Sequence, residues 1–141
     1  MKLTNTILLR AHNKNRKEHA RLKNHLKEVY KEQIDVQEET LSQEGFEDIH
    51  VLSAKLYRQP GQRLFLQNLN LLLTNKKALQ EELPKHVDEK HDLYFRLEQE
   101  SIYTQQWRFV HAGEVIQVRI NLCAHPKTRE NALRAAKQLF A

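Results

Sequence analysis

The first 44 residues of this 141-residue chain contain neither glycine nor proline, and Gly45 is the first residue that favours a break. An uninterrupted stretch of this kind predicts one long helix, from about Thr4 to Gln43. Wound at about 100 degrees per residue, it would carry an apolar stripe. That stripe consists of Leu8, Ala11, Asn15, Leu22, Leu26 and Val29. We therefore expect a basic amphipathic helix over residues 1–44, and its seven-residue spacings permit a coiled coil.

A helix of that length would be about 60 Å long, whereas a compact domain of this size has a radius of gyration of about 14 Å. The helix would therefore either bend near residues 13–18 or be covered by another chain. We expect the second outcome, a homo-oligomer. Its predicted interface residues are Leu8, Leu22, Leu26 and Val29.

The remaining residues, 45–141, are expected to form a small α+β domain. Ile49 to Arg58 and Arg63 to about Leu69 flank a Pro-Gly turn, which predicts a β-hairpin. A helix through the leucines of residues 64–73 is the alternative. Thr74 or Asn75 could cap a further helical region, which Pro84 would interrupt before it continues through residues 87–98.

Strand signals return near the carboxyl end. Trp107 to His111 and Val115 to Leu122 predict a second hairpin, and a final helix is expected between Pro126 and Phe140. The predicted fold class is therefore α+β: a long N-terminal amphipathic helix followed by a small antiparallel sheet of two hairpins packed with helices.

Positive charge is concentrated at the amino end. The chain has 23 Lys plus Arg and 18 Asp plus Glu, a net charge of +5. Residues 1–32 alone hold nine basic and three acidic residues, a difference of +6. Clustered cations release counterions from a phosphate backbone and so bind nucleic acid without reading its sequence. The candidate nucleic-acid-binding residues are Arg10, Lys14, Lys17, Arg21 and Lys23.

Two functions fit this charge layout. The first is a non-enzymatic, oligomeric nucleic-acid-binding or nucleoprotein-assembly factor that contacts the phosphates of DNA or RNA through its basic helix. The alternative is a protein-protein adaptor, chaperone or component of a larger machine that uses the long helix as its partner interface. A third interpretation needs no partner, because a long exposed helix also carries charges for solubility.

The sequence offers little catalytic chemistry. None of the eight histidines has the i, i+4 spacing of a helical zinc pair, so no metal site is predicted. Cys123 and His125 lack an orienting acid, and three glycines leave no room for a glycine-rich nucleotide loop. We therefore expect no enzyme and no cofactor. Trp107 and Phe109 beside Arg108 could stack on bases, but packing in the core is the stronger expectation.

No stretch of the sequence approaches the roughly 20 apolar residues that span a bilayer, and no targeting segment is recognised. The single cysteine, Cys123, excludes a disulfide framework and favours a reducing compartment. We therefore expect a cytoplasmic protein that does not associate with membranes.

Overall fold

A computed structural model describes residues 2–141, so Met1 of the predicted first segment lies outside the described residues. The fold is α+β, as the sequence predicts. The strands are β1 (Thr4–Asn13), β2 (Asp35–Leu41), β3 (Ile49–Leu56), β4 (Asp92–Glu98), β5 (Phe109–Val110) and β6 (Val115–Leu122). The helices are α1 (Arg16–Tyr30), α2 (Gln59–Leu72), α3 (Lys76–Glu82) and α4 (Arg129–Leu139).

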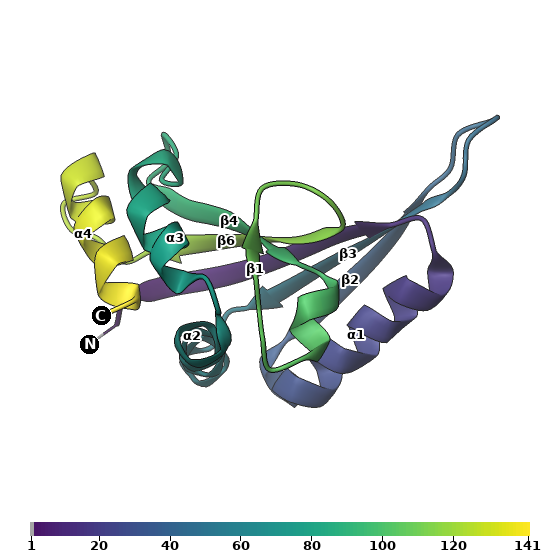
Figure 1. The fold of residues 1–141 in the computed structure, drawn as a ribbon, viewed down its shortest axis with the longest axis horizontal. Coiled ribbons are helices and arrows are strands. Elements are labelled where there is room, and N and C mark those ends of the chain that lie inside the picture. The colour runs from purple at the N-terminus through teal and green to yellow at the C-terminus, as the bar shows by residue number, and fades with distance from the viewer. Residues whose placement is uncertain (1) are drawn as a thin grey trace.

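All six strands form one antiparallel sheet in the order β2-β3-β1-β6-β4-β5 (Figure 1). The N-terminal strand β1 is therefore central, with Ile7 opposite Leu56 on one side and Ile120 on the other. The predicted boundary between residues 44 and 45 lies in the loop between β2 and β3. Strands from both predicted segments thus share a single sheet.

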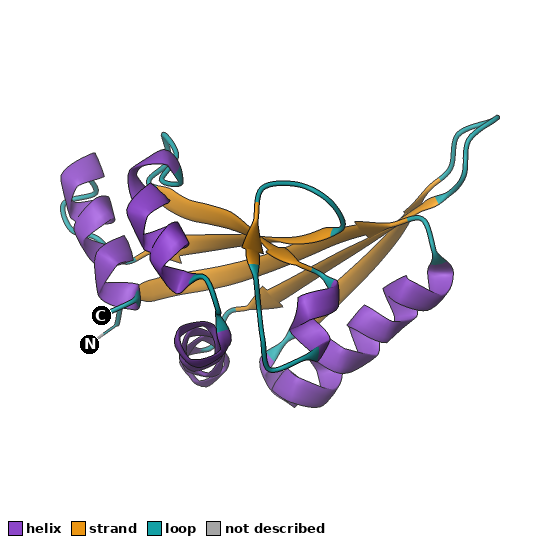
Figure 2. Cartoon of the chain, viewed as in Figure 1, coloured by secondary structure: helices purple, strands orange, loops and turns teal. Residues whose placement is uncertain are grey.

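The helices cover one face of this sheet. Figure 2 shows α1 and α2 beneath the strands, with α3 and α4 at the end where the two termini lie. The inward side chains of the strands are buried with those of the helices; among them, Leu22 of α1, Phe65 of α2 and Phe95 of β4 are 1% exposed. Every helix within residues 2–141 is too short or too polar to span a lipid bilayer.

The predicted long N-terminal helix is wrong, because the chain begins with strand β1. Ile7, Leu9 and Ala11 alternate with exposed or half-buried residues along β1, which is the two-residue period of a strand. The helix starts only at Arg16, where the Asn15 side chain accepts hydrogen bonds from the amides of Lys17 and Glu18. Asn15 is therefore a helix cap and not a member of an apolar stripe.

The last part of the predicted helix is also a strand. α1 ends at Tyr30, and β2 then pairs with β3 over their full lengths, from Asp35 opposite Lys55 to Leu41 opposite Ile49. A stretch without glycine or proline therefore does not have to form a single element. Residues 4–41 form a strand, a helix and a second strand, and no glycine or proline lies between them.

The predicted strand Ile49 to Arg58 is confirmed as β3, but its predicted partner is helix α2. Pro60 lies in the first turn of α2, where backbone amides have no acceptor within the helix. Its lack of an amide proton therefore costs no hydrogen bond. Gly61 is needed because a Cβ there would lie 2.8 Å from Cβ of Gln33. The alternative, a helix through the leucines of residues 64–73, is confirmed for this segment.

Farther along, α3 follows Asn75 and α4 lies within the predicted final helix. Residues 92–98 form strand β4 in place of the predicted helix. β6 is confirmed at its predicted bounds, but β4 separates it from β5, so the second predicted hairpin is wrong. β5 is held at its outer edge by Asn75, whose side chain accepts from the amide of Phe109 at 2.8 Å and donates to its carbonyl at 2.7 Å.

Candidate nucleic-acid interface

The face of the sheet opposite the helices carries polar side chains. Along β1, β6 and β4, every second residue points away from the core. Strand pairing aligns these residues in two rows across the three central strands. One row is Leu8, Arg119 and Tyr94, and the next is Arg10, Gln117 and Arg96.

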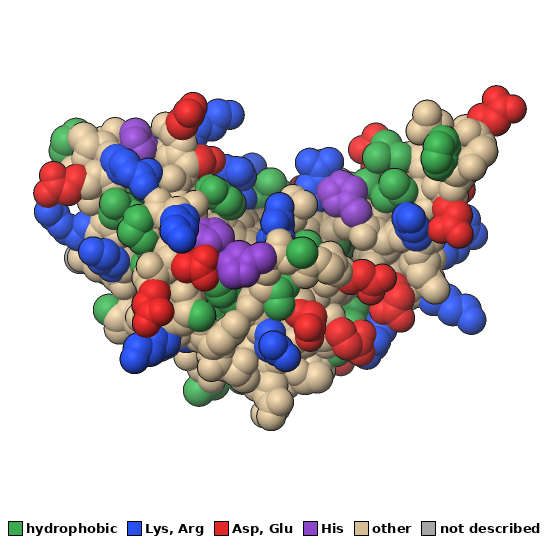
Figure 3. Space-filling view, turned by 45° about the horizontal axis from the view of Figure 1, so that its top comes forward, with side chains coloured by type: hydrophobic (Ala, Val, Ile, Leu, Met, Phe, Trp, Pro, Cys, Tyr) green, Lys and Arg blue, Asp and Glu red, His purple; other side chains and the backbone are tan. Residues whose placement is uncertain are grey.

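These rows line a hollow of about 310 Å³. Its lining includes Leu8, Arg10, Tyr94, Arg96, Gln117 and Arg119. Figure 3 shows the molecule hollowed between the end with α3 and α4 and the tip of the β2–β3 hairpin, with basic and histidine side chains along the hollow. We call this surface, with Lys55 of β3 included, the open face.

The open face is positively charged at its centre. Arg10, Lys55 and Arg96 are exposed, and none of them forms an ion pair within residues 2–141. Arg96 donates to the carbonyl of His111 at 2.7 Å, which fixes the position of its guanidinium without neutralising it. These cations are therefore available to an anion that approaches the sheet.

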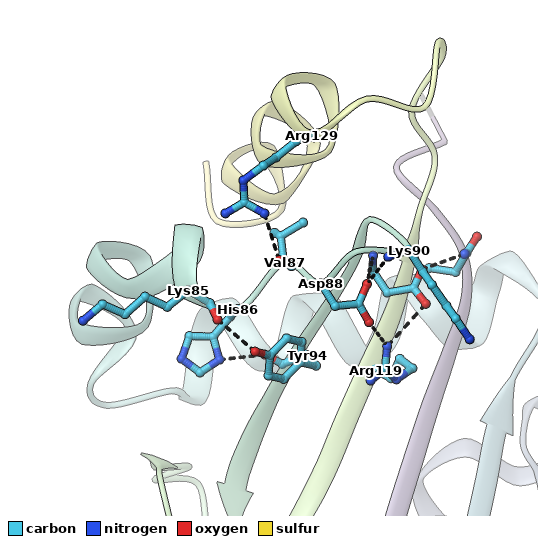
Figure 4. A network of polar contacts seen from close by, with 10 residues as sticks. Lys85, His86, Val87, Asp88, Lys90, Tyr94, Arg119 and Arg129 are labelled. Atoms are coloured by element: carbon cyan, nitrogen blue, oxygen red, sulfur yellow. Dashed lines mark hydrogen bonds and ion pairs between the residues drawn. The ribbon is translucent and has the colours of Figure 1, made fainter.

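The third arginine of the open face, Arg119, is neutralised (Figure 4). It pairs with Asp88 and lies 3.5 Å from the carboxylate of Asp92. Burial disfavours ionisation of Asp88, but the bonds from Arg119 and from the amides of Asp92 and Lys90 outweigh it and lower the pKa of Asp88. Arg119 is therefore held in place and adds little free charge.

Tyr94 supplies an aromatic ring to the open face. It is 38% exposed, and the guanidinium carbon of Arg119 lies 5.8 Å from its ring centroid. Its hydroxyl donates to the carbonyl of Lys85 at 2.9 Å, and its own carbonyl accepts from His86 (Figure 4). The ring is thus anchored at its polar end while one side meets solvent.

The structure places the predicted nucleic-acid-binding residues on two surfaces. Arg10 lies on the open face, whereas Lys14 follows β1 and the other three lie on α1. Two of those three have acidic partners. Arg21 pairs with Glu100 at 3.2 Å and lies over the Tyr103 ring. Lys23 pairs with Glu38 at 2.8 Å.

The pairing of Lys23 also affects Glu38. Hydrogen bonds from Lys23 and from His19 lower the pKa of the Glu38 carboxyl group, so this carboxylate is ionised at neutral pH. Among the α1 candidates, Lys17 is exposed and forms no ion pair within the described part of the chain. The predicted basic row of the helix is therefore partly neutralised by the molecule itself.

The predicted interface residues are mostly core residues. Leu22 and Leu26 are 1% and 3% exposed within the single chain, and Val29 packs against the same core. Leu8 lies on the open face. The helical leucines and Val29 are covered by this chain's own sheet, so they do not support an oligomer.

Sequence reasoning missed Arg96, Arg119 and Tyr94 as members of one surface with Arg10. The alternation of Leu93, Phe95 and Leu97 with polar residues is the signal that identifies β4 and its outward side chains. Trp107 and Phe109, which the sequence offered as residues that could stack on bases, are not available for stacking. Each is 4% exposed and belongs to the core.

Comparison with known proteins identifies the family to which this chain belongs. The model of a family described as "RNA binding" matches residues 6–122, which include all six strands except the first two residues of β1. This chain belongs to that RNA-binding family. It is similar to RNA-binding protein PAB1135 of Pyrococcus abyssi, with 30% identity over 120 residues, which cover 80% of this chain and 78% of that protein.

Solved structures share the fold of this RNA-binding family member. Mth689 from Methanothermobacter thermautotrophicus, a DUF54 protein, matches with a TM-score of 0.80 and 20% identity over 99% of this chain and all of that one. SSO0741 from Sulfolobus solfataricus matches with a TM-score of 0.68 and 15% identity, covering 96% and 97% of the two chains. At these identities the likeness concerns the fold.

Proposed function

We propose that this protein is a non-enzymatic RNA-binding protein that contacts RNA through its open face. Arg10, Lys55 and Arg96 contact phosphates, and Tyr94 stacks on an unpaired base. The observation that carries the proposal is the alignment of unpaired cations with an exposed ring on the one sheet face that no helix covers. Membership of the RNA-binding family supports RNA as the nucleic acid.

The choice of surface follows from charge. Each cation that replaces condensed counterions on a phosphate backbone adds affinity that falls as salt rises. A cation already paired with a carboxylate must first lose that partner. Arg21 and Lys23 on α1 are in this position, whereas Arg10 and Arg96 are not. The open face is therefore the better phosphate-binding surface of the two.

The double variant R10Q/R96Q should bind a single-stranded RNA oligonucleotide about 10-fold more weakly at 0.15 M salt. Two lost phosphate contacts should also reduce the slope of log affinity against log salt by about 1.4. Fluorescence anisotropy over a salt series measures both quantities, and circular dichroism checks that the fold is retained.

The matched control is K17Q/K27Q, which removes two positive charges from exposed positions of α1, on the helical side of the sheet. Its affinity should fall by less than about 3-fold, because only long-range attraction is lost. Equal losses in the two variants would contradict a binding site on the open face and would favour the helix.

Replacing Tyr94 by Leu tests the stacking contact. Base stacking on an aromatic side chain contributes about 1–3 kcal/mol, and every base has a face that can stack. Y94L should therefore weaken binding of single-stranded RNA by about that amount. Duplex RNA should be unaffected, because its bases are already stacked. Parallel titrations with the two RNAs give the result, and an equal loss for both would rule out stacking by Tyr94.

A further inference from the structure

A cluster of metal-ligating side chains lies beside the open face. Glu82 is the last residue of α3, His86 follows a short 3-10 turn (Leu83–Lys85), and His111 follows β5. One ligand atom from each of the three residues lies within 4.8 Å of the other two. Glu82 and His86 are four residues apart, but His111 comes from a distant segment, so no spacing between histidines in the sequence predicts a site.

The contacts inside the cluster already resemble a ligand shell. Nε2 of His111 lies 2.9 Å from Oε1 of Glu82, and Nε2 of His86 lies 3.8 Å from the same oxygen. Ligands at about 2.0–2.1 Å from a tetrahedral zinc ion lie about 3.3 Å apart. His111 has a side chain that is 67% exposed, so it can close the remaining distance without disturbing the core.

The tautomer of His86 is set for metal binding. Its Nδ1 lies 2.8 Å from the carbonyl oxygen of Tyr94, as Figure 4 shows. A carbonyl oxygen only accepts, so Nδ1 must donate its proton. In the neutral ring, Nε2 then keeps its lone pair and faces Glu82. Metal-binding histidines usually have this arrangement, in which the second ring nitrogen donates to a fixed acceptor.

Phe109 packs beside both imidazole rings. The buried Phe109 makes edge contacts with each ring, at centroid distances of 5.5 Å to His86 and 5.0 Å to His111. Arg96 donates to the carbonyl of His111 and fixes the backbone there. Restraint of the His86 ring and of the His111 backbone before binding reduces the entropy lost when a ligand shell forms.

We propose that Glu82, His86 and His111 bind a divalent transition-metal ion such as Zn²⁺. Two imidazoles and one carboxylate favour Zn²⁺ and its neighbours over Mg²⁺, which prefers oxygen ligands. Three protein ligands leave a fourth position, which water fills on the exposed side of His111. The bound ion would tie the end of α3 to the loop before β4 and to the turn after β5.

The test is a zinc titration of the full chain after exhaustive treatment with a chelator. Calorimetry, together with competition against a coloured chelator, should give one Zn²⁺ per chain, and millimolar Mg²⁺ should not displace it. The ring Cε1–H signals of His86 and His111 should shift in the proton NMR spectrum when zinc is added.

Substitutions identify the ligands. H111A and E82Q should each weaken zinc binding by at least about 100-fold, since loss of even a supporting residue costs about 10- to 100-fold. Because His111 is exposed, H111A should keep the fold, which circular dichroism checks. The matched control is H12A, an exposed histidine on β1 outside the cluster. Parent affinity in H111A, an equal loss in H12A, or no binding by the parent chain would overturn the proposal.

Discussion

Replacing Leu22 by Ala should lower the free energy of unfolding by about 3 kcal/mol. Leu22 is 1% exposed and belongs to the core between α1 and the sheet. Removing its buried methyl groups loses their transfer free energy and leaves a cavity that the packed neighbours fill only in part. Urea unfolding followed by circular dichroism measures the change.

The same experiment separates a core residue from a subunit-interface residue, which is the role the sequence suggested for Leu22. An oligomer that dissociates as it unfolds has an unfolding midpoint that rises with protein concentration, whereas the midpoint of a monomer does not depend on concentration. The midpoint of the parent chain and that of L22A should each be equal at protein concentrations 20-fold apart. The control is L71A on α2, where the side chain is 80% exposed and the loss should stay below about 0.5 kcal/mol. A midpoint that rises with concentration would restore the interface interpretation.

Replacing Gln62 by Leu should lower the free energy of unfolding by about 3 kcal/mol as well. Gln62 lies in α2 and is 1% exposed, and its side chain joins that helix to the two strands beside it. Its amide nitrogen donates to the carbonyls of Asn5 at 2.8 Å and Leu56 at 3.0 Å, and its oxygen accepts from Thr4 at 2.5 Å. A leucine of similar size leaves these buried groups unpaired, at about 1–3 kcal/mol each and less than additively.

The control for this variant is Q67L, which makes the same chemical change at an exposed position of the same helix. Gln67 makes no side-chain hydrogen bond within residues 2–141, so its substitution should change stability by less than about 0.5 kcal/mol. Comparable losses in Q62L and Q67L would show that the hydrogen bonds of Gln62 contribute little.

Local patterns were sufficient for some elements. The fold class, β3, β6 and α4 follow from alternation and turn residues that act over a few residues. α3 begins after Asn75 as expected, but the Asn75 side chain bonds to Phe109 and does not cap the helix. β6 is the clearest case, because Ile116, Val118, Ile120 and Leu122 alternate with polar residues over its whole length. Its bounds in the structure are the predicted ones.

The N-terminal error has a physical cause. Leu8 and Ala11 belong to a strand and Leu22 and Leu26 to a helix, yet their angles on one helical wheel agree by chance. Asn15 falls in the same arc of the wheel, although an Asn before a run of helix-forming residues is also the ordinary sign of a helix start. A stretch without glycine or proline is compatible with strands as well as with helices, and the two-residue period around Ile7 indicates the strand.

The candidate site needed information that no local pattern contains. Arg10, Arg96 and Arg119 are distant in sequence and meet only because β1 and β4 both pair with β6. Their rows depend on strand register, in which a shift by one residue would turn every side chain to the other face. Arg10 was identified as a candidate from charge alone, and its neighbours could be identified only from the sheet.

The Asn75 side chain at the outer edge of β5 affects the tendency of the protein to aggregate. The Asn75 side chain bonds to both outward backbone groups of Phe109, so these groups cannot pair with a strand of another molecule at this edge of the sheet. The opposite rim, β2, is lined by the exposed acids Asp35, Glu38 and Glu39, which repel a like rim on another molecule. A sheet blunted at both rims resists growth into fibrils even when the protein is crowded.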